Sequence, residues 1–109
     1  MRLVLLVLTV AGCATTETQY AQGKQSLAQG DYHTAFMELE PVAEKGNASA
    51  QYTVAYMYYY GEGVPRDPQQ ARRWMQLAAD QGLTEAEEGL KTITAQVQPT
   101  TAYTTSLIS

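Results

Sequence analysis

Several residue types that carry chemistry are nearly missing from this 109-residue chain. Cysteine, histidine, tryptophan and phenylalanine each occur once. A single cysteine excludes an internal disulfide. One cysteine and one histidine also argue against a structural zinc site, which takes four thiolate or imidazole ligands. The sequence therefore predicts no metal site, and it contains no motif that would hold a cofactor.

Basic residues are also scarce. Seven Lys and Arg stand against eleven Asp and Glu, and the net charge is −4. A protein that binds nucleic acid must neutralise phosphates with a basic surface. We therefore expect no nucleic acid partner.

The sequence has little in the way of long hydrophobic runs. Its longest apolar run covers residues 3–10 and is interrupted only by Thr9, whereas a helix that spans a bilayer needs ~20 residues. Together with Arg2 before it, this run is typical of the apolar part of a signal peptide, which we assign to residues 1–12.

The single cysteine follows this run directly. A branched apolar residue and two small residues precede Cys13, and this order resembles the lipobox of bacterial lipoproteins. The resemblance implies a lipid on the Cys13 thiol, cleavage before Cys13, and a short tether over residues 13–18. It also implies the bacterial cell envelope, and Ala14 in place of an Asp favours the periplasmic face of the outer membrane. The alternative is an ordinary signal peptide with a stray cysteine at its cleavage site.

Candidate catalytic groups are few and isolated. His33 has no Cys, Ser or carboxylate near it at the spacing of a known motif. Glu38, Glu40 and Glu44 lie on one predicted helix, whereas a glycosidase pair needs two carboxyls opposed across a cleft. We therefore expect a surface position for His33, a solvated row of carboxylates, and no enzymatic activity.

Two helical patterns surround a glycine-rich turn in the middle of the chain. They cover residues 48–60 and 68–81, and apolar residues recur in both at steps of three and four. Asp67 is a suitable N-cap for the second pattern, and Pro68 suits a first helical position. The sequence therefore predicts an αα-hairpin here.

This hairpin resembles the Sel-one-like repeat, a relative of the tetratricopeptide repeat. The residues that match the repeat pattern are Ala48, Ala50, Gln51, Tyr58, Gly61, Gly63, Val64, Asp67, Ala71, Trp74, Ala78, Ala79 and Gly82. Val54 replaces the usual Leu, and Ala55 replaces the usual Gly. The resemblance implies a stacked helical array that acts as an adaptor or scaffold, and it names no catalytic group.

A second hairpin precedes this one, and one further helix follows it. Helices are predicted over residues 19–29 and 32–45, and Asp31, Ala35, Ala43 and Gly46 recur 36 residues later as Asp67, Ala71, Ala79 and Gly82. A fifth helix is predicted from Thr84 as a cap, with Trp74 buried beneath it. The fold class is all-α: a short αα-hairpin solenoid over residues 19–97, with a C-terminal capping helix and a disordered tail over residues 98–109.

Tyrosines form the second functional feature of the sequence besides Cys13. Four of them share one helical stripe at i, i+4, i+7 and i+8: Tyr52, Tyr56, Tyr59 and Tyr60. Tyrosine is favoured at binding surfaces, so we expect these four to contact a partner. Glu62 nearby would favour basic partners. The alternative is that Tyr52 and Tyr56 pack on the preceding hairpin, while Tyr58 faces the neighbouring helix in either case.

These observations predict a membrane-anchored periplasmic lipoprotein that acts as a protein–protein interaction module. An unidentified protein, the membrane itself and a second copy of the chain are the partners that we consider. Two other functions stay open. One is an enzyme or accessory factor that acts on the cell wall, related to peptidoglycan or β-lactams, although the family members linked to that chemistry have cysteine pairs that this chain lacks. The other is a binder of small peptides or glycans.

Overall fold

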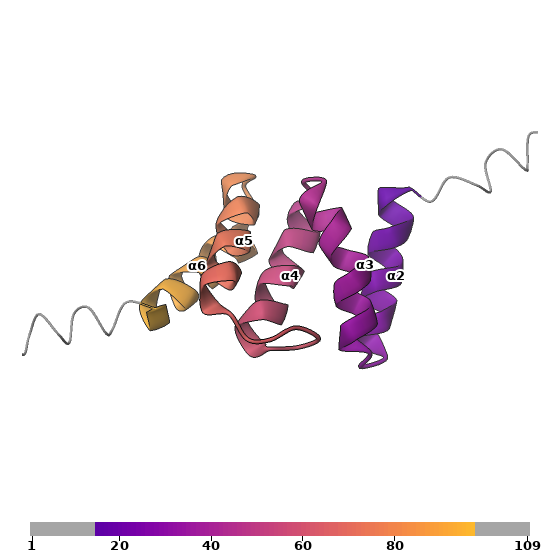
Figure 1. Cartoon of the computed structure of the whole chain (residues 1–109). Coiled ribbons are helices and arrows are strands. Elements are labelled where there is room, and N and C mark those ends of the chain that lie inside the picture. Colours follow the sequence, from indigo (N-terminus) through magenta and orange to yellow (C-terminus); the bar gives the residue numbers. More distant parts are fainter. Residues whose placement is uncertain (1–14, 98–109) are drawn as a thin grey trace, which may run out of the picture.

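The computed structural model describes residues 15–97, which form five α-helices. They are α2 (Thr16–Ala28), α3 (Tyr32–Glu44), α4 (Ala48–Tyr60), α5 (Pro68–Asp80) and α6 (Thr84–Val97). Each helix packs against the next one along the chain, so that α2 and α6 lie at opposite ends of the stack (Figure 1). The predicted all-α solenoid of hairpins, with a last single helix, is confirmed.

The first helix begins earlier than the sequence suggested. It was expected from residue 19, but α2 begins at Thr16, and the hydroxyl of Thr15 caps it by accepting the backbone N–H of Thr18 at 3.3 Å. The end of the predicted tether at residue 18 is therefore wrong, because its last three residues are helical. The predicted signal peptide (1–12), Cys13 and the predicted tail (98–109) lie outside the described residues.

Side-chain caps explain where three further helices begin. Asp31 accepts the backbone N–H of Thr34, and Asn47 accepts that of Ala50. Asp67 accepts two backbone N–H groups at the start of α5, where Pro68 occupies the first turn. Each cap satisfies donors that the first helical turn leaves unpaired. None of the helices in residues 15–97 combines the length and the apolar character that a membrane crossing requires.

The core consists of two clusters of buried side chains. The first joins α3 and α4 through Ala35, Leu39, Val42, Ala43, Ala50, Val54 and Met57. The second joins α4, α5 and α6 through Ala55, Tyr59, Ala71, Met75, Ala78, Ala86 and Ile93. Trp74 and Tyr58 are partly buried and pack against both clusters. Trp74 was expected to be buried beneath the capping helix, but it is only partly buried because it lies between the two clusters and connects them.

The loop between α4 and α5 reaches back to the first hairpin. Figure 1 shows it extending from the end of α4 towards α3. A Cβ on Gly63 would collide with the backbone of Tyr32 and His33, and Gly63 has a φ of +75°. Only glycine combines this close approach with a left-handed backbone. The glycine-rich loop therefore docks the second hairpin onto the N-terminus of α3.

The two hairpins repeat the same side-chain contact with different sequence offsets. Gln81 donates through Nε2 to Oε1 of the buried Gln51 at 2.9 Å, and Lys45 donates through Nζ to Oε1 of Gln19 at 3.4 Å. The two acceptors, Gln19 and Gln51, are 32 positions apart (51 − 19), whereas the two donors, Lys45 and Gln81, are 36 positions apart (81 − 45). The difference equals the four additional residues of the α4–α5 loop, 61–67 against 29–31.

Helix α6 ends the stack with a polar face. Three residues of α4 pack in or against the second cluster: Tyr52, Ala55 and Tyr59. The equivalent positions of α6 lie 36 residues later. They are occupied by Glu88, Lys91 and Ala95, and all three are exposed. A further helix would need apolar residues at all three positions, and Glu88 and Lys91 are charged. The sequence therefore makes α6 a cap, and end-to-end stacking of a second copy at this face is disfavoured.

Candidate interaction surfaces

The tyrosines of α4 form a row of contacting rings that ends at the surface. The Tyr52 and Tyr56 rings meet edge to face at 4.9 Å, and the Tyr56 and Tyr60 rings stack at 5.9 Å with an interplanar angle of 11°. Tyr52 and Tyr56 are partly buried against the second cluster, whereas Tyr60 is 62% exposed. Tyr59 also meets Tyr60 edge to face at 4.9 Å, so the structure brings all four predicted residues together, with Tyr60 as the accessible one.

Tyr59 differs from the expectation that it is available to a partner. It is 8% exposed, and its hydroxyl donates to Oε1 of Gln96 at 2.6 Å. The reason is that α6 covers this side of α4, a contact that periodicity within α4 could not reveal. Tyr59 belongs to the core that joins α4 to α6, so the expectation that it contacts a partner is wrong.

A positive charge lies next to this row, in addition to Glu62, which follows Tyr60 by two positions. The Cζ of Arg66 lies 5.8 Å from the centre of the Tyr59 ring, and its Nε donates to the Tyr59 carbonyl oxygen at 2.9 Å. Burial, followed by the neighbouring Tyr52, raises the pKa of Tyr56 above its usual value of 10.0. The Tyr56 hydroxyl therefore stays protonated at physiological pH.

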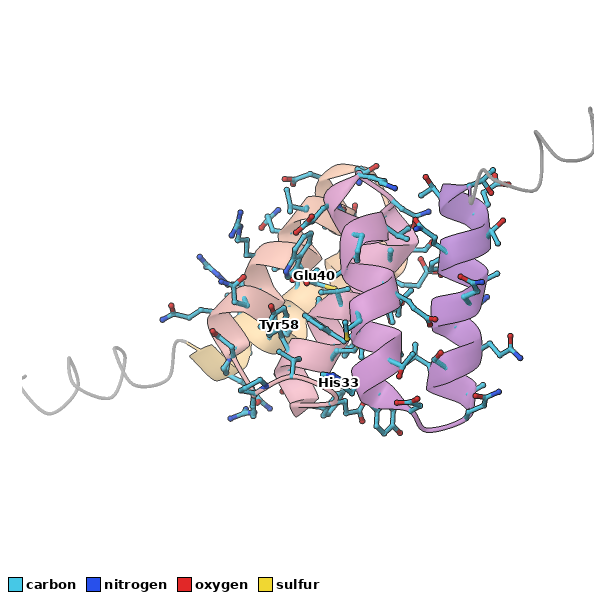
Figure 2. All side chains as sticks on the ribbon, turned by 45° about the vertical axis from the view of Figure 1, so that its right-hand side comes forward. His33, Glu40 and Tyr58 are labelled. Atoms are coloured by element: carbon cyan, nitrogen blue, oxygen red, sulfur yellow. The ribbon has the colours of Figure 1, made fainter. Side chains whose placement is uncertain are left out.

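A second aromatic contact joins the hairpins. Tyr58 meets Phe36 of α3 edge to face at 5.4 Å, which confirms that Tyr58 faces the neighbouring helix. Burial raises the pKa of Tyr58, and the carboxylates of Glu40 and Asp67 raise it further. Figure 2 shows Glu40 and His33 on either side of Tyr58 along this face. His33 is exposed, as expected.

Two carboxylates of α3 interact with other parts of the fold. Glu38 is not merely solvated, because its Oε2 accepts the Ser26 hydroxyl of α2 at 2.8 Å. Burial, and then repulsion from Glu44 one turn away, raise the pKa of Glu40. Within residues 15–97, His, Cys, Asp and Glu form no group of three or more that could hold a metal ion.

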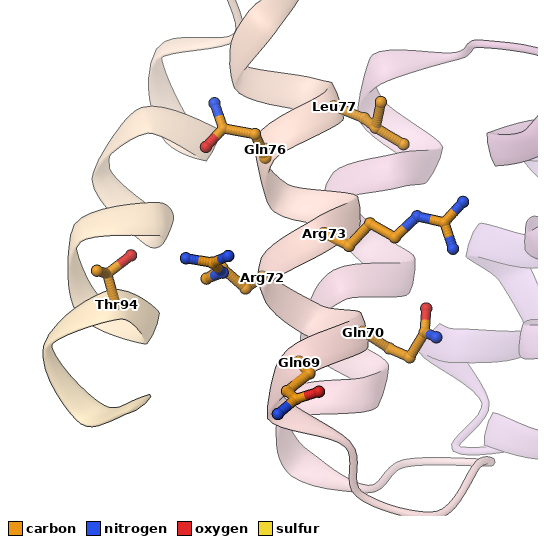
Figure 3. Close-up of a pocket in the computed structure, with 7 residues that line it drawn as sticks. All are labelled: Gln69, Gln70, Arg72, Arg73, Gln76, Leu77 and Thr94. Carbon is orange, nitrogen blue, oxygen red and sulfur yellow. The ribbon is translucent and has the colours of Figure 1, made fainter. Parts of the chain in front are cut away.

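A polar pocket along α5 was not identified from the sequence. Its volume is about 770 Å³, and Figure 3 shows its lining residues: Gln69, Gln70, Arg72, Arg73, Gln76, Leu77 and Thr94. A smaller pocket of about 300 Å³ adjoins it and shares Gln69 with it, and Arg66 lines this second pocket. One sequence signal could have indicated the site. Three of the seven basic residues of the chain fall within residues 66–73.

The middle of the chain matches a known repeat family. Residues 48–83 match the family model described as "Sel1 repeat". These are α4, the glycine-rich loop, α5 and the start of the next turn, which is the stretch that carries the resemblance in the sequence.

Relatives with established descriptions are much longer than this chain. The chain is 35% identical over 80 residues to the ERAD-associated E3 ubiquitin-protein ligase component HRD3A of Arabidopsis thaliana, which covers 72% of this chain and 12% of the relative. It is 35% identical over 72 residues to chitin synthase regulatory factor 3 of Schizosaccharomyces pombe, with 66% and 8% covered.

A bacterial structure shows the same arrangement of helices. The Sel1 repeat protein from Oxalobacter formigenes superimposes with a TM-score of 0.69 at 36% sequence identity, over 72% of this chain and 24% of that one. Residues 48–83 thus form a Sel1 repeat, in a chain whose five described helices pack as consecutive hairpins typical of such repeats.

Proposed function

We propose that this protein is a membrane-anchored interaction module of the bacterial cell envelope, and that it holds a protein partner at a surface centred on Tyr60. The observation that carries the proposal is the exposed Tyr60 ring, which stacks on Tyr56 at the end of the tyrosine row. Sel1 repeats generally act as scaffolds for protein interaction, which supports a binding function over catalysis.

The row of rings suits a binding surface for a physical reason. Tyr60 is in contact with Tyr56 and with the buried Tyr59, at ring distances of 5.9 and 4.9 Å. A ring that neighbours already hold in place loses little conformational freedom when a partner covers it. It also offers a partner both apolar area and a hydroxyl, the combination that is enriched at binding hot spots.

The descriptions of the relatives agree with such a function. One is a component of a ubiquitin ligase and another is a regulatory factor of an enzyme. Neither description names the repeat segment as an enzyme, and the chain covers 12% or less of either relative. These descriptions therefore favour an accessory or regulatory role for the repeats. The partner proposed for this chain is not taken from either relative.

The interaction is tested by a pair of matched substitutions. Tyr60 and Met37 are both 62% exposed, but Met37 lies on α3 and outside the tyrosine row. We expect Tyr60→Ala to reduce, at least about tenfold, the amount of partner that co-purifies after chemical crosslinking of intact cells. Met37→Ala should leave that amount unchanged. Equal yields from both variants would place the binding surface elsewhere.

Anchoring is the second part of the proposal. Cys13 follows a short apolar run at the position that a lipobox requires, and two or three acyl chains on one residue form a stable anchor because each buried CH₂ contributes about 0.8 kcal/mol. The periplasmic face of the outer membrane is the proposed location.

The anchor is tested by labelling with a palmitate analogue. Wild-type protein should carry the label and sediment with membranes, while Cys13→Ser should carry none and should appear as a soluble or uncleaved product. Ala14→Asp is the matched variant for location: it should keep the label and move the protein to the inner membrane. Label retained by Cys13→Ser would contradict the lipoprotein assignment.

A further inference from the structure

Three arginines gather on one side of an acidic molecule. The chain has eleven acidic and seven basic residues, yet Arg66 in the α4–α5 loop and Arg72 and Arg73 on α5 lie within eight positions and are all exposed. Among residues 15–97, the ion pair within 4 Å joins Lys91 to Glu88, and it involves none of these arginines. The charges of Arg72 and Arg73 are therefore available to a molecule from solution, while Arg66 already donates through Nε to the Tyr59 carbonyl oxygen.

These arginines line the two adjoining pockets of α5. Figure 3 shows the Arg72 side chain directed towards α6 and Thr94, while Arg73 and Gln70 extend from the other side of the helix. Arg66 lines the smaller pocket next to Gln69, which both pockets share. The two pockets therefore form one continuous surface, which we call the α5 basic surface.

No carboxylate lines either pocket. The acidic residue that lies nearest in sequence, Asp67, already accepts the backbone N–H groups of Gln69 and Gln70 as the N-cap of α5. The charge of the surface is thus positive, in contrast to the charge of the molecule as a whole.

We propose that the α5 basic surface binds an acidic, extended segment of a partner protein. Arginine presents a planar set of donors that pairs with a carboxylate through two parallel hydrogen bonds. The amides of Gln69 and Gln70 each offer a donor and an acceptor, which suits the alternating N–H and C=O groups of a peptide backbone. Gln76 donates through Nε2 to Oδ1 of Asp80 at 2.8 Å. Leu77 is 39% exposed at the end of the larger pocket and offers an apolar contact.

The composition of the surface favours a peptide over an anionic membrane. Surfaces that bind acidic lipids use clusters of about four to eight Lys and Arg, whereas this one has three arginines among four glutamines. The glutamine amides and the leucine contribute nothing specific to a lipid headgroup, but they match a peptide. Tyr59, which contacts Tyr60, lines the smaller pocket. The proposal still does not depend on the Tyr60 surface, because its test changes Arg72 and Arg73 and leaves Tyr60 in place.

The test uses the purified full chain and two labelled peptides of equal length. One peptide repeats Asp, Glu and Leu, and the other repeats Asn, Gln and Leu. By fluorescence anisotropy at ~50 mM salt, where surface charges are weakly screened, the acidic peptide should bind at least about tenfold more tightly than the neutral one. The double variant Arg72→Gln with Arg73→Gln should lose at least that factor.

The matched control removes two positive charges elsewhere. Lys24→Gln with Lys45→Gln changes the net charge equally but acts on the first hairpin, and it should bind the acidic peptide as wild type does. Both double variants alter exposed side chains, and circular dichroism checks their folding. If the arginine variant is unfolded, Arg72→Gln alone, which should lose at least about threefold, replaces it.

Three results would overturn the proposal: equal binding of the two peptides, equal loss in both double variants, or no binding of the acidic peptide. A stronger, arginine-dependent binding to vesicles that contain an anionic lipid would overturn it in favour of the membrane. Each of these results leaves the Tyr60 experiment unaffected, so failure here and failure of the proposed function can be told apart.

Discussion

At the scale of single residues, Gly63 determines how the second hairpin meets the first. Its α-carbon lies against the backbone at the start of α3, where no side chain fits. The sequence motif identified Gly63 as a turn residue only, because the partner of the close approach lies 30 positions away in the chain (63 − 33). Contacts of this kind require the packed structure.

The effect of that contact can be separated from the effect of backbone strain. Gly30 has a similar φ of +80°, but nothing lies within 4 Å of the Cβ that it would carry. We expect Gly30→Ala to lower the free energy of unfolding by about 1 kcal/mol through strain alone. Gly63→Ala should lower it by about 3 kcal/mol or more, since the loop must also leave α3. Urea unfolding measures both values, and equal losses would contradict the docking of the loop.

The raised pKa of Tyr58 predicts how the free energy of unfolding changes at alkaline pH. Burial, Glu40 and Asp67 raise its pKa above the usual value of 10.0, which the unfolded chain retains. Below about pH 10 the hydroxyl is protonated in both states and contributes no pH dependence. Above about pH 10 the unfolded chain loses this proton first, so the free energy of unfolding should fall as pH rises.

Substitution of Tyr58 tests that sign. Urea unfolding from about pH 8 to about pH 11 should show a shallower alkaline decline in Tyr58→Phe than in wild type, because one shifted group is gone. Tyr56→Phe should act in the same direction, as the pKa of Tyr56 is also raised. A decline that is as steep in Tyr58→Phe as in wild type would mean that Tyr58 titrates alike in both states.

At the scale of elements, the local sequence predicted the helices well. Asp67 was recognisable as an N-cap, and Asp31 precedes it by one repeat period of 36 residues; α4 and α5 begin where the apolar period and Pro68 place them. The start of α2 was missed because Thr15 and Thr16 continue a polar stretch with no apolar period. Caps and periodicity are local features, and the boundaries that depend on them are readable from sequence.

Trp74 shows the energetic link between elements. It lies on α5, is partly buried, and packs against both core clusters. Trp74→Ala should lower the free energy of unfolding by about 3 kcal/mol, a large share of the ~5–10 kcal/mol expected for a small domain. Leu77→Ala on the same helix, where the side chain is 39% exposed, should lower it by less than about 0.5 kcal/mol.

Thermal unfolding followed by circular dichroism would check this pair of variants. The midpoint should fall by many degrees for Trp74→Ala and barely change for Leu77→Ala. A Trp74→Ala protein that melts like wild type would show that the two clusters are stable without the residue that connects them.

At the scale of the whole molecule, the order of hairpins was predictable and the surfaces only in part. The four-tyrosine stripe was recognised, but the covering of Tyr59 by α6 depends on how two distant helices cross. The α5 basic surface was missed because an overall charge of −4 hides a local cluster of arginines. Periodicity shows which residues share a face of one helix, and only packing shows which faces remain exposed.

The central claim is that a partner contacts the exposed end of the tyrosine row, and site-specific photo-crosslinking in living cells tests it most directly. A photoreactive amino acid replaces Tyr60 in one strain and Met37, which is equally exposed at 62%, in another. The account predicts a discrete crosslinked product of the same partner from position 60 and none from position 37. No product from position 60, or the same product from both positions, would contradict it.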